Sequence, residues 1–202
     1  MLRAVFRILL YCATALLTFD MTSGAEPESF HATDLQGHEV KQLATNDARV
    51  VVLIFAATDC PISNRYIPEI ARLKQEFSSR HVAFWWIFPN PDDTRTVVLK
   101  HQHEYAIDVP ILIDSRQDLV HLAHAAVTPE TAVFTAENGT LHQTYHGRID
   151  DRYLAFGKER PQAAHHDLSA AIHAALDGHA APSTHTDPIG CSIIPISSEQ
   201  HR

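Results

Sequence analysis

The segment from Arg49 to Ala57 constrains the fold more than any other part of the chain. It is a run of Val, Leu, Ile and Phe with almost no polar interruption. Such a run is typical of a strand that is buried on both faces of a sheet. This segment therefore predicts a central strand, which ends at Thr58-Asp59-Cys60.

Directly after this strand the hydrophobic period changes to that of a helix. From Pro61 to about Ser79, apolar residues recur at spacings of three and four, which is typical of an amphipathic helix. Pro61 suits the first helical turn, and Pro68 is expected to kink the helix. A second buried strand over 82–88 and a helix over 93–105 follow. This order predicts parallel strands joined by a right-handed crossover.

The remaining elements are expected to be shorter. A hairpin over 30–43 turns at Gln36-Gly37, and two later strands are joined by Asn138-Gly139, which favours a tight turn. The other expected elements are a short strand over 109–113, a short helix over 117–125, the strands over 131–135 and 140–147, and a last helix over 166–176.

The first 25 residues have the pattern of a secretory signal peptide. Arg3 and Arg7 precede an apolar stretch over 8–19, and Ser23-Gly24-Ala25 supplies a small-residue end. The apolar stretch has about a dozen residues, fewer than the roughly 20 that span a bilayer, so an uncleaved anchor is the weaker alternative. We expect a periplasmic or secreted protein with no stable membrane span after cleavage.

Length and charge narrow the classes of function. A chain of 202 residues predicts one domain with short extensions. We expect a signal peptide over 1–25, a domain over 26–178 and a tail over 179–202. The net charge is -8 and the 16 Lys and Arg residues form no block, which argues against nucleic-acid binding.

Cys60 is the candidate nucleophile because it closes a buried strand and opens a helix. Unpaired N–H groups at a helix N-terminus stabilise a thiolate and lower the cysteine pKa. Asp59 opposes this effect through its negative charge. The structural alternative is that Cys60 is a small buried hydrophobic residue.

Three segments resemble the thioredoxin-like superfamily, in particular the redoxin branch of alkyl hydroperoxide reductases, thiol-specific antioxidants and exported thiol-disulfide oxidoreductases. They are F-H-A-T-D-L-Q-G-H-E-V over 30–40, T-D-C-P-I-S-N over 58–64 and V-T-P-E over 127–130. The resemblance covers about 30–175. It implies an α/β thioredoxin-like fold, with a central mixed sheet flanked by helices, an N-terminal β-hairpin and an inserted helix.

The resemblance also implies that the Thr128–Pro129 bond is cis and faces Cys60. The chain departs from the family at other positions. Ser63 stands where dithiol members have a second cysteine, so exchange cannot be completed within the motif, although Ser63 can hydrogen-bond the thiolate. Peroxidatic members have Thr or Ser three residues before the cysteine and Pro seven before it. Here these positions are Ala57 and Leu53, which weakens the peroxidase hypothesis.

Cys191 offers a second thiol outside the motif. It lies in an apolar island over 189–193, within an otherwise polar tail, and such an island is expected to dock on the domain. If it docks over Cys60, Cys191 is a resolving thiol or a permanent bridge partner. The alternative is an independent or intermolecular thiol.

Arginines and histidines add weaker candidates. Arg148, in the run G-R-I-D-D-R, can stabilise a thiolate at Cys60, and the alternative is a salt-bridged turn. Of the 15 histidines, His142 and His146 are four apart in an expected strand and should share a face. No histidine spacing is specific for a metal, and we expect no cofactor.

The leading hypothesis is an exported thiol-disulfide oxidoreductase. Cys60 would be the nucleophile, Pro129 would shape the substrate groove, and Cys191 would resolve the mixed disulfide. Its partners would be protein thiols or disulfides, or a peroxide, together with an external reductant. One alternative is a thiol peroxidase that passes through a sulfenic acid at Cys60. Another is a non-enzymatic module that binds a partner, or copper through Cys60, Cys191 and histidine.

Overall fold

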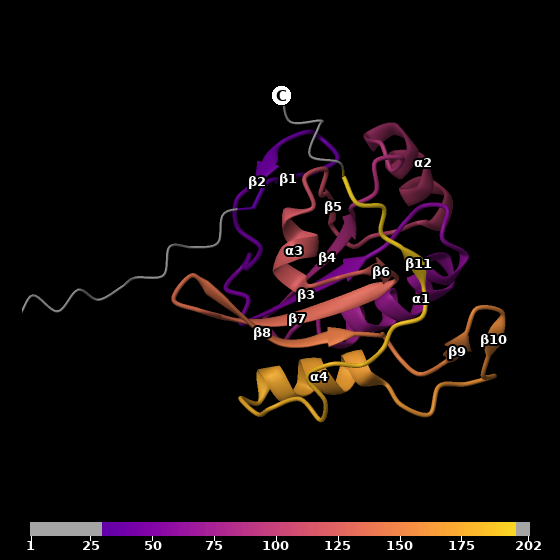
Figure 1. Cartoon of the computed structure of the whole chain (residues 1–202). Helices are drawn as coiled ribbons and strands as arrows, with labels where there is room; N and C mark the ends of the chain where they lie inside the picture. Colours follow the sequence, from indigo (N-terminus) through magenta and orange to yellow (C-terminus); the bar gives the residue numbers. More distant parts are fainter. Residues whose placement is uncertain (1–29, 197–202) are drawn as a thin grey trace, which may run out of the picture.

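The structure is a computed structural model that describes residues 30–196 of the chain (Figure 1). The signal peptide expected over 1–25 lies outside the described residues, as does the end of the tail. Within 30–196 no helix is both long and apolar enough to cross a membrane.

A mixed seven-stranded sheet forms the centre of the molecule, in the order β2-β1-β5-β4-β3-β7-β8. The central strand pairs in parallel with β4 and antiparallel with β7, which confirms the predicted mixed sheet and parallel pair. The strands of this sheet are β1 (Ala32–Thr33), β2 (Glu39–Val40), β3 (Val50–Phe55), β4 (Val82–Phe88), β5 (Ile111–Ile113), β7 (Glu130–Glu137) and β8 (Thr140–Gly147).

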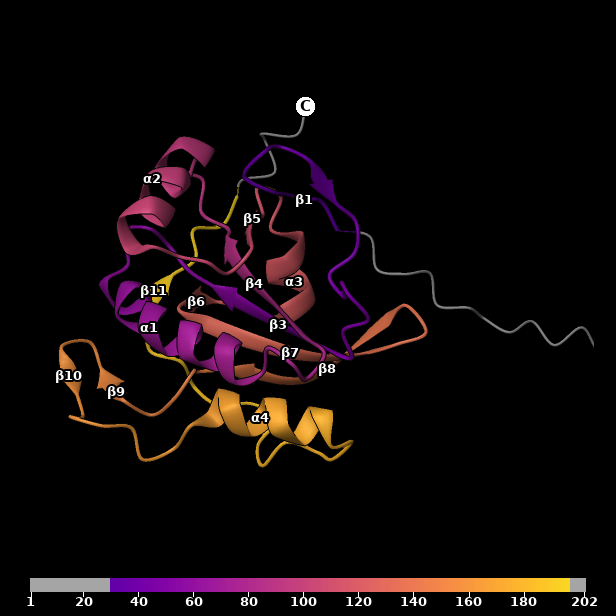
Figure 2. The ribbon, with the colours of Figure 1, turned by 180° about the vertical axis from the view of Figure 1, so that it is seen from behind.

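Helices cover both faces of this sheet (Figures 1 and 2). Successive residues of β3 point to opposite faces, and all six are buried, because each face has its own apolar cluster. Residues of α1, α2 and α4 pack in one cluster and residues of α3 in the other. The helices are α1 (Pro61–Glu76), α2 (Arg95–Tyr105), α3 (Asp118–Ala123) and α4 (Asp167–Leu176).

The observed helices match the predicted segments closely and differ mainly at their ends. Helix α1 ends at Glu76, before the expected Ser79, and Phe77 turns inward as a fully buried cap residue. Helix α2 begins at Arg95 rather than at 93, because Thr94 has an extended backbone and its side chain accepts from the Val97 amide.

One prediction about β8 is wrong. The register of β8 against β7 shifts between Val133 and Phe134, which leaves Thr144 without a partner. This bulge changes the alternation of side chains along the strand. His142 therefore lies opposite Thr135 and His146 opposite Ala132, so the two imidazoles lie on opposite faces of the sheet.

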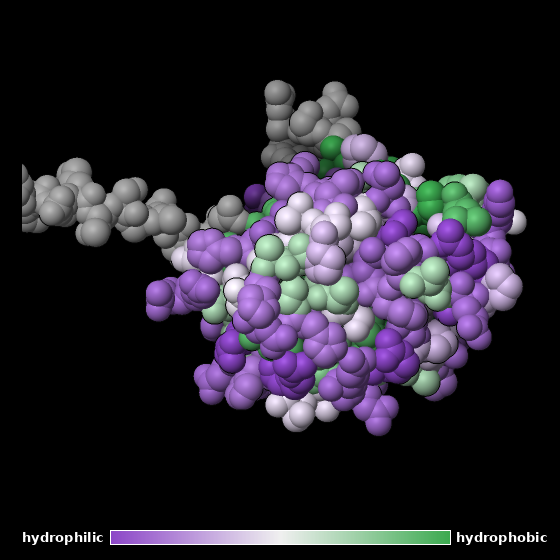
Figure 3. Space-filling model, turned by 90° about the horizontal axis from the view of Figure 1, so that it is seen from below, coloured by the Kyte–Doolittle hydropathy of each residue, from purple (hydrophilic) through white to green (hydrophobic). Residues whose placement is uncertain are grey.

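The C-terminal tail runs from α4 back across the domain (Figure 1). Its strand β11 (Cys191–Ser192) pairs antiparallel with β6 (Val127–Thr128). Beside this tail, β9 (Tyr153–Ala155) and β10 (Lys158–Glu159) form a separate hairpin. The pairing of β11 with β6 makes the tail an integral part of the fold. Hydrophilic side chains cover most of the face on which α4 lies (Figure 3).

Gly147 tests how closely the tail packs on β8. A Cβ at this position would lie 2.2 Å from the Thr186 carbonyl oxygen, and φ is +140°, which L residues rarely adopt. We expect Gly147→Ala to lower the free energy of unfolding by about 2 kcal/mol, because the collision overpacks the tail. Gly157→Ala is the control, since Gly157 also has a positive φ but no atom within 4 Å of its added Cβ. Equal urea midpoints for the two variants would contradict close packing of the tail.

Candidate functional site

The turn between β3 and α1 positions Cys60. The Cys60 amide donates to the Ala57 carbonyl at 3.2 Å, and the Asn64 amide donates to the Cys60 carbonyl at 3.1 Å. Cys60 is therefore the N-cap residue of a helix of 16 residues, with Pro61 in its first turn. Its thiol lies where unpaired N–H groups and the helix dipole favour a negative charge.

Hydrogen bonds of three buried or partly buried side chains, those of Asp93, Asn64 and His101, hold this turn in place. Asp93 Oδ1 accepts from both the amide and the hydroxyl of Thr58, at 3.0 and 2.6 Å. Asn64 Nδ2 donates to the Thr58 carbonyl at 3.2 Å, and Asn64 Oδ1 lies 2.8 Å from His101 Nε2. Burial raises the pKa of Asp93, and it lowers that of His101. Sequence reasoning missed this network because no motif links Asp93 and His101, which lie just before and within α2, to the turn at Cys60.

The cis-proline loop faces the thiol, as the family resemblance implied. The Thr128–Pro129 peptide bond is cis. The Thr128 carbonyl oxygen lies 3.0 Å from Cys60 Sγ and accepts from the protonated thiol. This carbonyl opposes ionisation of Cys60, because a thiolate has no proton to donate to it.

The tail brings the second thiol onto the first. Cys191 is the register partner of Thr128, and the two cysteine sulfurs lie 2.9 Å apart. A disulfide bond would measure about 2.05 Å, so the structure holds two thiols in hydrogen-bond contact. The apolar island around Cys191 does dock over Cys60.

Glycine makes this approach possible. A Cβ at Gly190 would lie 2.3 Å from the Thr128 carbonyl oxygen. Beyond the cysteine, the Ile193 amide donates to the Ala126 carbonyl at 3.0 Å, and the Ile193 side chain is buried. Before it, the Thr186 hydroxyl lies 2.7 Å from the Tyr145 hydroxyl. The tail is therefore held on both sides of Cys191.

The two thiols have opposite electrostatic environments. Burial raises the pKa of Cys60, but donor groups of Cys191 and Ser63 that can stabilise its thiolate outweigh burial, so the pKa lies below its ordinary value. Burial, the hydrogen bond to Cys60 and the negative charges of Cys60 and Asp59 raise the pKa of Cys191 to about 12. These environments favour ionisation of Cys60 over ionisation of Cys191, whose thiol donates a hydrogen bond to Cys60 Sγ.

Ser63 supplies a further donor at the expected position. Ser63 is fully buried, and its hydroxyl forms no hydrogen bond with any of the described residues. The hydroxyl is therefore available to a thiolate at Cys60, and it contributes to the lowered pKa of that thiol.

Arg148 has a different partner from the one proposed for it. Its Nε donates to Asp167 Oδ2 at 2.7 Å, and this hydrogen bond is the main reason that its pKa is raised. Asp167 lies in the first turn of α4. The guanidinium thus forms an ion pair between the residue that follows β8 and α4, which is the salt-bridged alternative, and it donates no hydrogen bond to Cys60.

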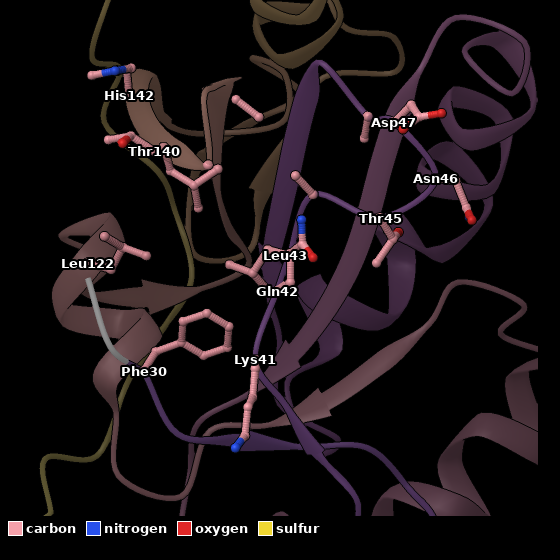
Figure 4. A pocket seen from close by; sticks show the side chains of 15 residues that line it. Phe30, Lys41, Gln42, Leu43, Thr45, Asn46, Asp47, Leu122, Thr140 and His142 are labelled. Carbon is pink, nitrogen blue, oxygen red and sulfur yellow. The ribbon is translucent and has the colours of Figure 1, made fainter. Parts of the chain in front are cut away.

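Metal ligands and a large cavity are two other features that could mark a site. Within residues 30–196 no three His, Cys, Asp or Glu side chains are placed to hold a metal ion. A cavity of about 770 Å³ lies elsewhere, between residues 41–48, Leu122 and the β7–β8 hairpin (Figure 4). Ala48 in its wall precedes β3, whereas Cys60 follows it, so the cavity lies toward the other end of that strand.

Known structures share this architecture. A hypothetical protein from Sinorhizobium meliloti 1021 aligns with 25% identity and a TM-score of 0.67, over 81% of this chain and 89% of that one. An uncharacterized conserved protein from Geobacillus kaustophilus aligns with 26% identity and a TM-score of 0.67, over 86% and 92%. A thiol-disulfide oxidoreductase from Bacteroides fragilis aligns with 14% identity and a TM-score of 0.50, over 60% and 89%.

These likenesses establish the thioredoxin-like fold. No curated protein matches the chain. The model of the AhpC/TSA family matches residues 24–145, which is more than half of the sequence and includes both Cys60 and the cis-proline loop. The chain belongs to the AhpC/TSA family of redoxins.

Proposed function

We propose that this protein is a thiol-disulfide oxidoreductase in which Cys60 and Cys191 form the exchanging pair. The observation that carries the proposal is the 2.9 Å contact between their sulfurs. Ser63 removes the second thiol of the usual motif, and the tail supplies one from a distance of 131 residues. Membership of the redoxin family supports a redox role on thiol or peroxide substrates.

In the proposed cycle the Cys60 thiolate attacks one sulfur of a substrate disulfide. A bond forms between Cys60 Sγ and that sulfur, and the other substrate sulfur leaves as a thiolate and takes a proton. Cys191 then loses its proton and attacks Cys60 Sγ, which releases the second substrate thiol. Two electrons pass from the protein to the substrate, and an external thiol reductant must restore the pair. Thr128 and Pro129 form the wall that faces Cys60.

Attack by the reduced protein requires local movement of the tail. Cys60 is 0% exposed, and β11 lies across it. In the reduced state, hydrogen bonds and packing hold β11 with no covalent link to Cys60. Such a contact of two paired residues opens more easily than the core strands.

Substitution of each cysteine tests the assignment of roles. In an assay with insulin as the disulfide substrate and dithiothreitol as the external reductant, we expect Cys60→Ser to abolish the catalysed reduction, because the variant lacks the thiolate. Cys191→Ser should instead trap a mixed disulfide with the substrate at Cys60, visible by mass spectrometry. Full insulin-reductase activity of Cys60→Ser would refute the proposal.

Ser63 should set the pH at which Cys60 becomes reactive. A hydrogen bond to a charged group contributes about 1.5 kcal/mol, so Ser63→Ala should raise the pKa of Cys60 by about one unit. Because the thiolate is the reactive form, the pH profile of iodoacetamide alkylation should shift to higher pH. Ser78→Ala is the control, since the Ser78 hydroxyl donates to the Gln75 carbonyl at an exposed site. Superimposable profiles for Ser63→Ala and wild type would exclude this role.

Gly190 should govern formation of the disulfide. We expect Gly190→Ala to slow oxidation of the pair by at least about tenfold, because its Cβ would collide with the Thr128 carbonyl and move Cys191 away. Gly178→Ala is a conservative control, because Gly178 has a φ of +71° but an added Cβ there would have no atom within 4 Å. Thiol loss measured in an oxidised glutathione buffer would be equally fast in both variants if the tail did not deliver Cys191.

The family match also favours a second candidate, reduction of a hydroperoxide. The Cys60 thiolate would attack one peroxide oxygen and break the O–O bond, which gives a sulfenic acid while the other oxygen leaves as an alcohol or water. The Cys191 thiol would then condense with the sulfenic acid to form the disulfide and release a molecule of water. Ala57 and Leu53 lack the polar and proline residues expected of peroxidatic members. Peroxide consumption no faster than that of a small free thiol would exclude this candidate.

A further inference from the structure

In the oxidised form of the pair, an external reductant can attack the disulfide at the sulfur of Cys60 or at the sulfur of Cys191. Closing the 2.9 Å contact to a bond of about 2.05 Å requires less than 1 Å of movement. The disulfide can therefore form with the tail in its present place. Its two sulfurs then lie in different surroundings.

Burial separates the two sulfurs. Cys60 is completely buried and belongs to the apolar cluster beneath α1. Cys191 lies on β11, packs against the edge of this cluster and is only partly buried. A thiol from solvent or from a partner protein thus reaches Cys191 without any rearrangement of the core.

The direction of attack strengthens this difference. Thiol–disulfide exchange is an in-line displacement, so the nucleophile approaches each sulfur from the side opposite the bond that breaks. Attack on Cys60 would come from the side away from Cys191, which is the protein interior. Attack on Cys191 would come from the side away from Cys60, which is the outer side of the tail.

The anchors of the tail keep this arrangement in the oxidised state. Ile194 is held after Cys191, where its amide donates to Asn90 Oδ1 at 3.0 Å and its carbonyl accepts from Gln117 Nε2 at 2.7 Å. The side chain of Ile193 is buried in the second apolar cluster. The disulfide adds a covalent link to these contacts, so Cys60 is less able to emerge than it is in the reduced protein.

We propose that external thiols reduce the oxidised protein by attack on Cys191, with Cys60 as the leaving group. This inference rests on the proposed function. The external thiolate sulfur bonds to Cys191 Sγ, the Cys60–Cys191 bond breaks, and its electron pair stays on Cys60. A second external thiolate attacks the external sulfur of the mixed disulfide, which releases Cys191 to take a proton. Two thiols thus become one disulfide and the protein gains two electrons.

The environment of Cys60 suits a leaving group. A thiol of lower pKa leaves faster in this exchange. The helix N-terminus favours the thiolate, and Ser63 contributes to the lowered pKa of Cys60. Burial is the largest cause that raises the pKa of Cys191, and Cys191 lies on a strand with no helix N-terminus to offset it, so Cys191 would be the poorer leaving group. The burial of the two sulfurs, the direction of in-line attack and the quality of the leaving group therefore all favour attack on the sulfur of Cys191.

Trapping the mixed disulfide tests this inference directly. Oxidised full-length protein, shown by mass to hold the Cys60–Cys191 bond, is mixed with N-acetylcysteine for short times and quenched in acid. Free thiols are then alkylated in denaturant, and the peptides are mapped by mass spectrometry. We expect the N-acetylcysteine adduct on Cys191 and the alkyl group on Cys60, in at least about tenfold excess over the reverse pattern at the earliest times.

Two variants of neighbouring tail residues complete the test. Ile193→Ala removes a buried anchor, and we expect it to reduce the preference for Cys191 several-fold, because a looser tail exposes Cys60. Ile194→Ala changes a side chain that is 49% exposed and should leave the preference unchanged. Adducts mainly on Cys60 in the wild type would overturn the inference and leave the proposed function intact. Absence of a Cys60–Cys191 bond in fully oxidised protein would overturn both.

Discussion

The contact between the sulfurs of Cys60 and Cys191 is the interaction around which the site is organised. Strand β3 and helix α1 fix Cys60 in the core, and the Thr128–Pro129 loop provides the edge on which β11 pairs. Gly190 lets the tail pass against the Thr128 carbonyl. Together these features bring the sulfurs of two residues that are 131 positions apart in sequence to 2.9 Å from each other.

The two thiols of the pair lie in two different structural elements, Cys60 at the N-terminus of α1 and Cys191 in β11. In a motif with both cysteines in one helical turn, the two thiols share the same helix. Here one thiol lies buried at the helix N-terminus, and the other lies on the C-terminal tail. In the proposed cycle the tail of the reduced protein opens to admit the substrate, whereas the disulfide ties the tail of the oxidised protein to Cys60. Substrate and reductant would then enter by different routes.

Much of the scaffold was predictable because its signals are local. The apolar run over 49–57, the change of period at Pro61 and the Asn138-Gly139 turn each predict an element that the structure contains. The cis isomer at Thr128–Pro129 followed only from the family resemblance. The faces of His142 and His146 were predicted wrongly, because a bulge at Thr144 depends on pairing with β7 and has no composition signal.

The partners of the site were harder to predict because they depend on tertiary contacts. Sequence spacing could not show that Asp93, Asn64 and His101 clamp the turn before Cys60. Arg148 was a plausible donor to the thiolate, but Asp167, from a later helix, binds it. The apolar island around Cys191 did indicate a docking tail. Its position over Cys60 required the fold.

The most direct test of the account is a redox titration of the full-length protein in dithiothreitol buffers, with Cys60 and Cys191 quantified by peptide mapping at each potential. We expect one two-electron transition in which both thiols disappear together and a peptide pair linked through Cys60 and Cys191 appears. Independent titration of the two cysteines, or oxidation that yields only intermolecular disulfides, would contradict it.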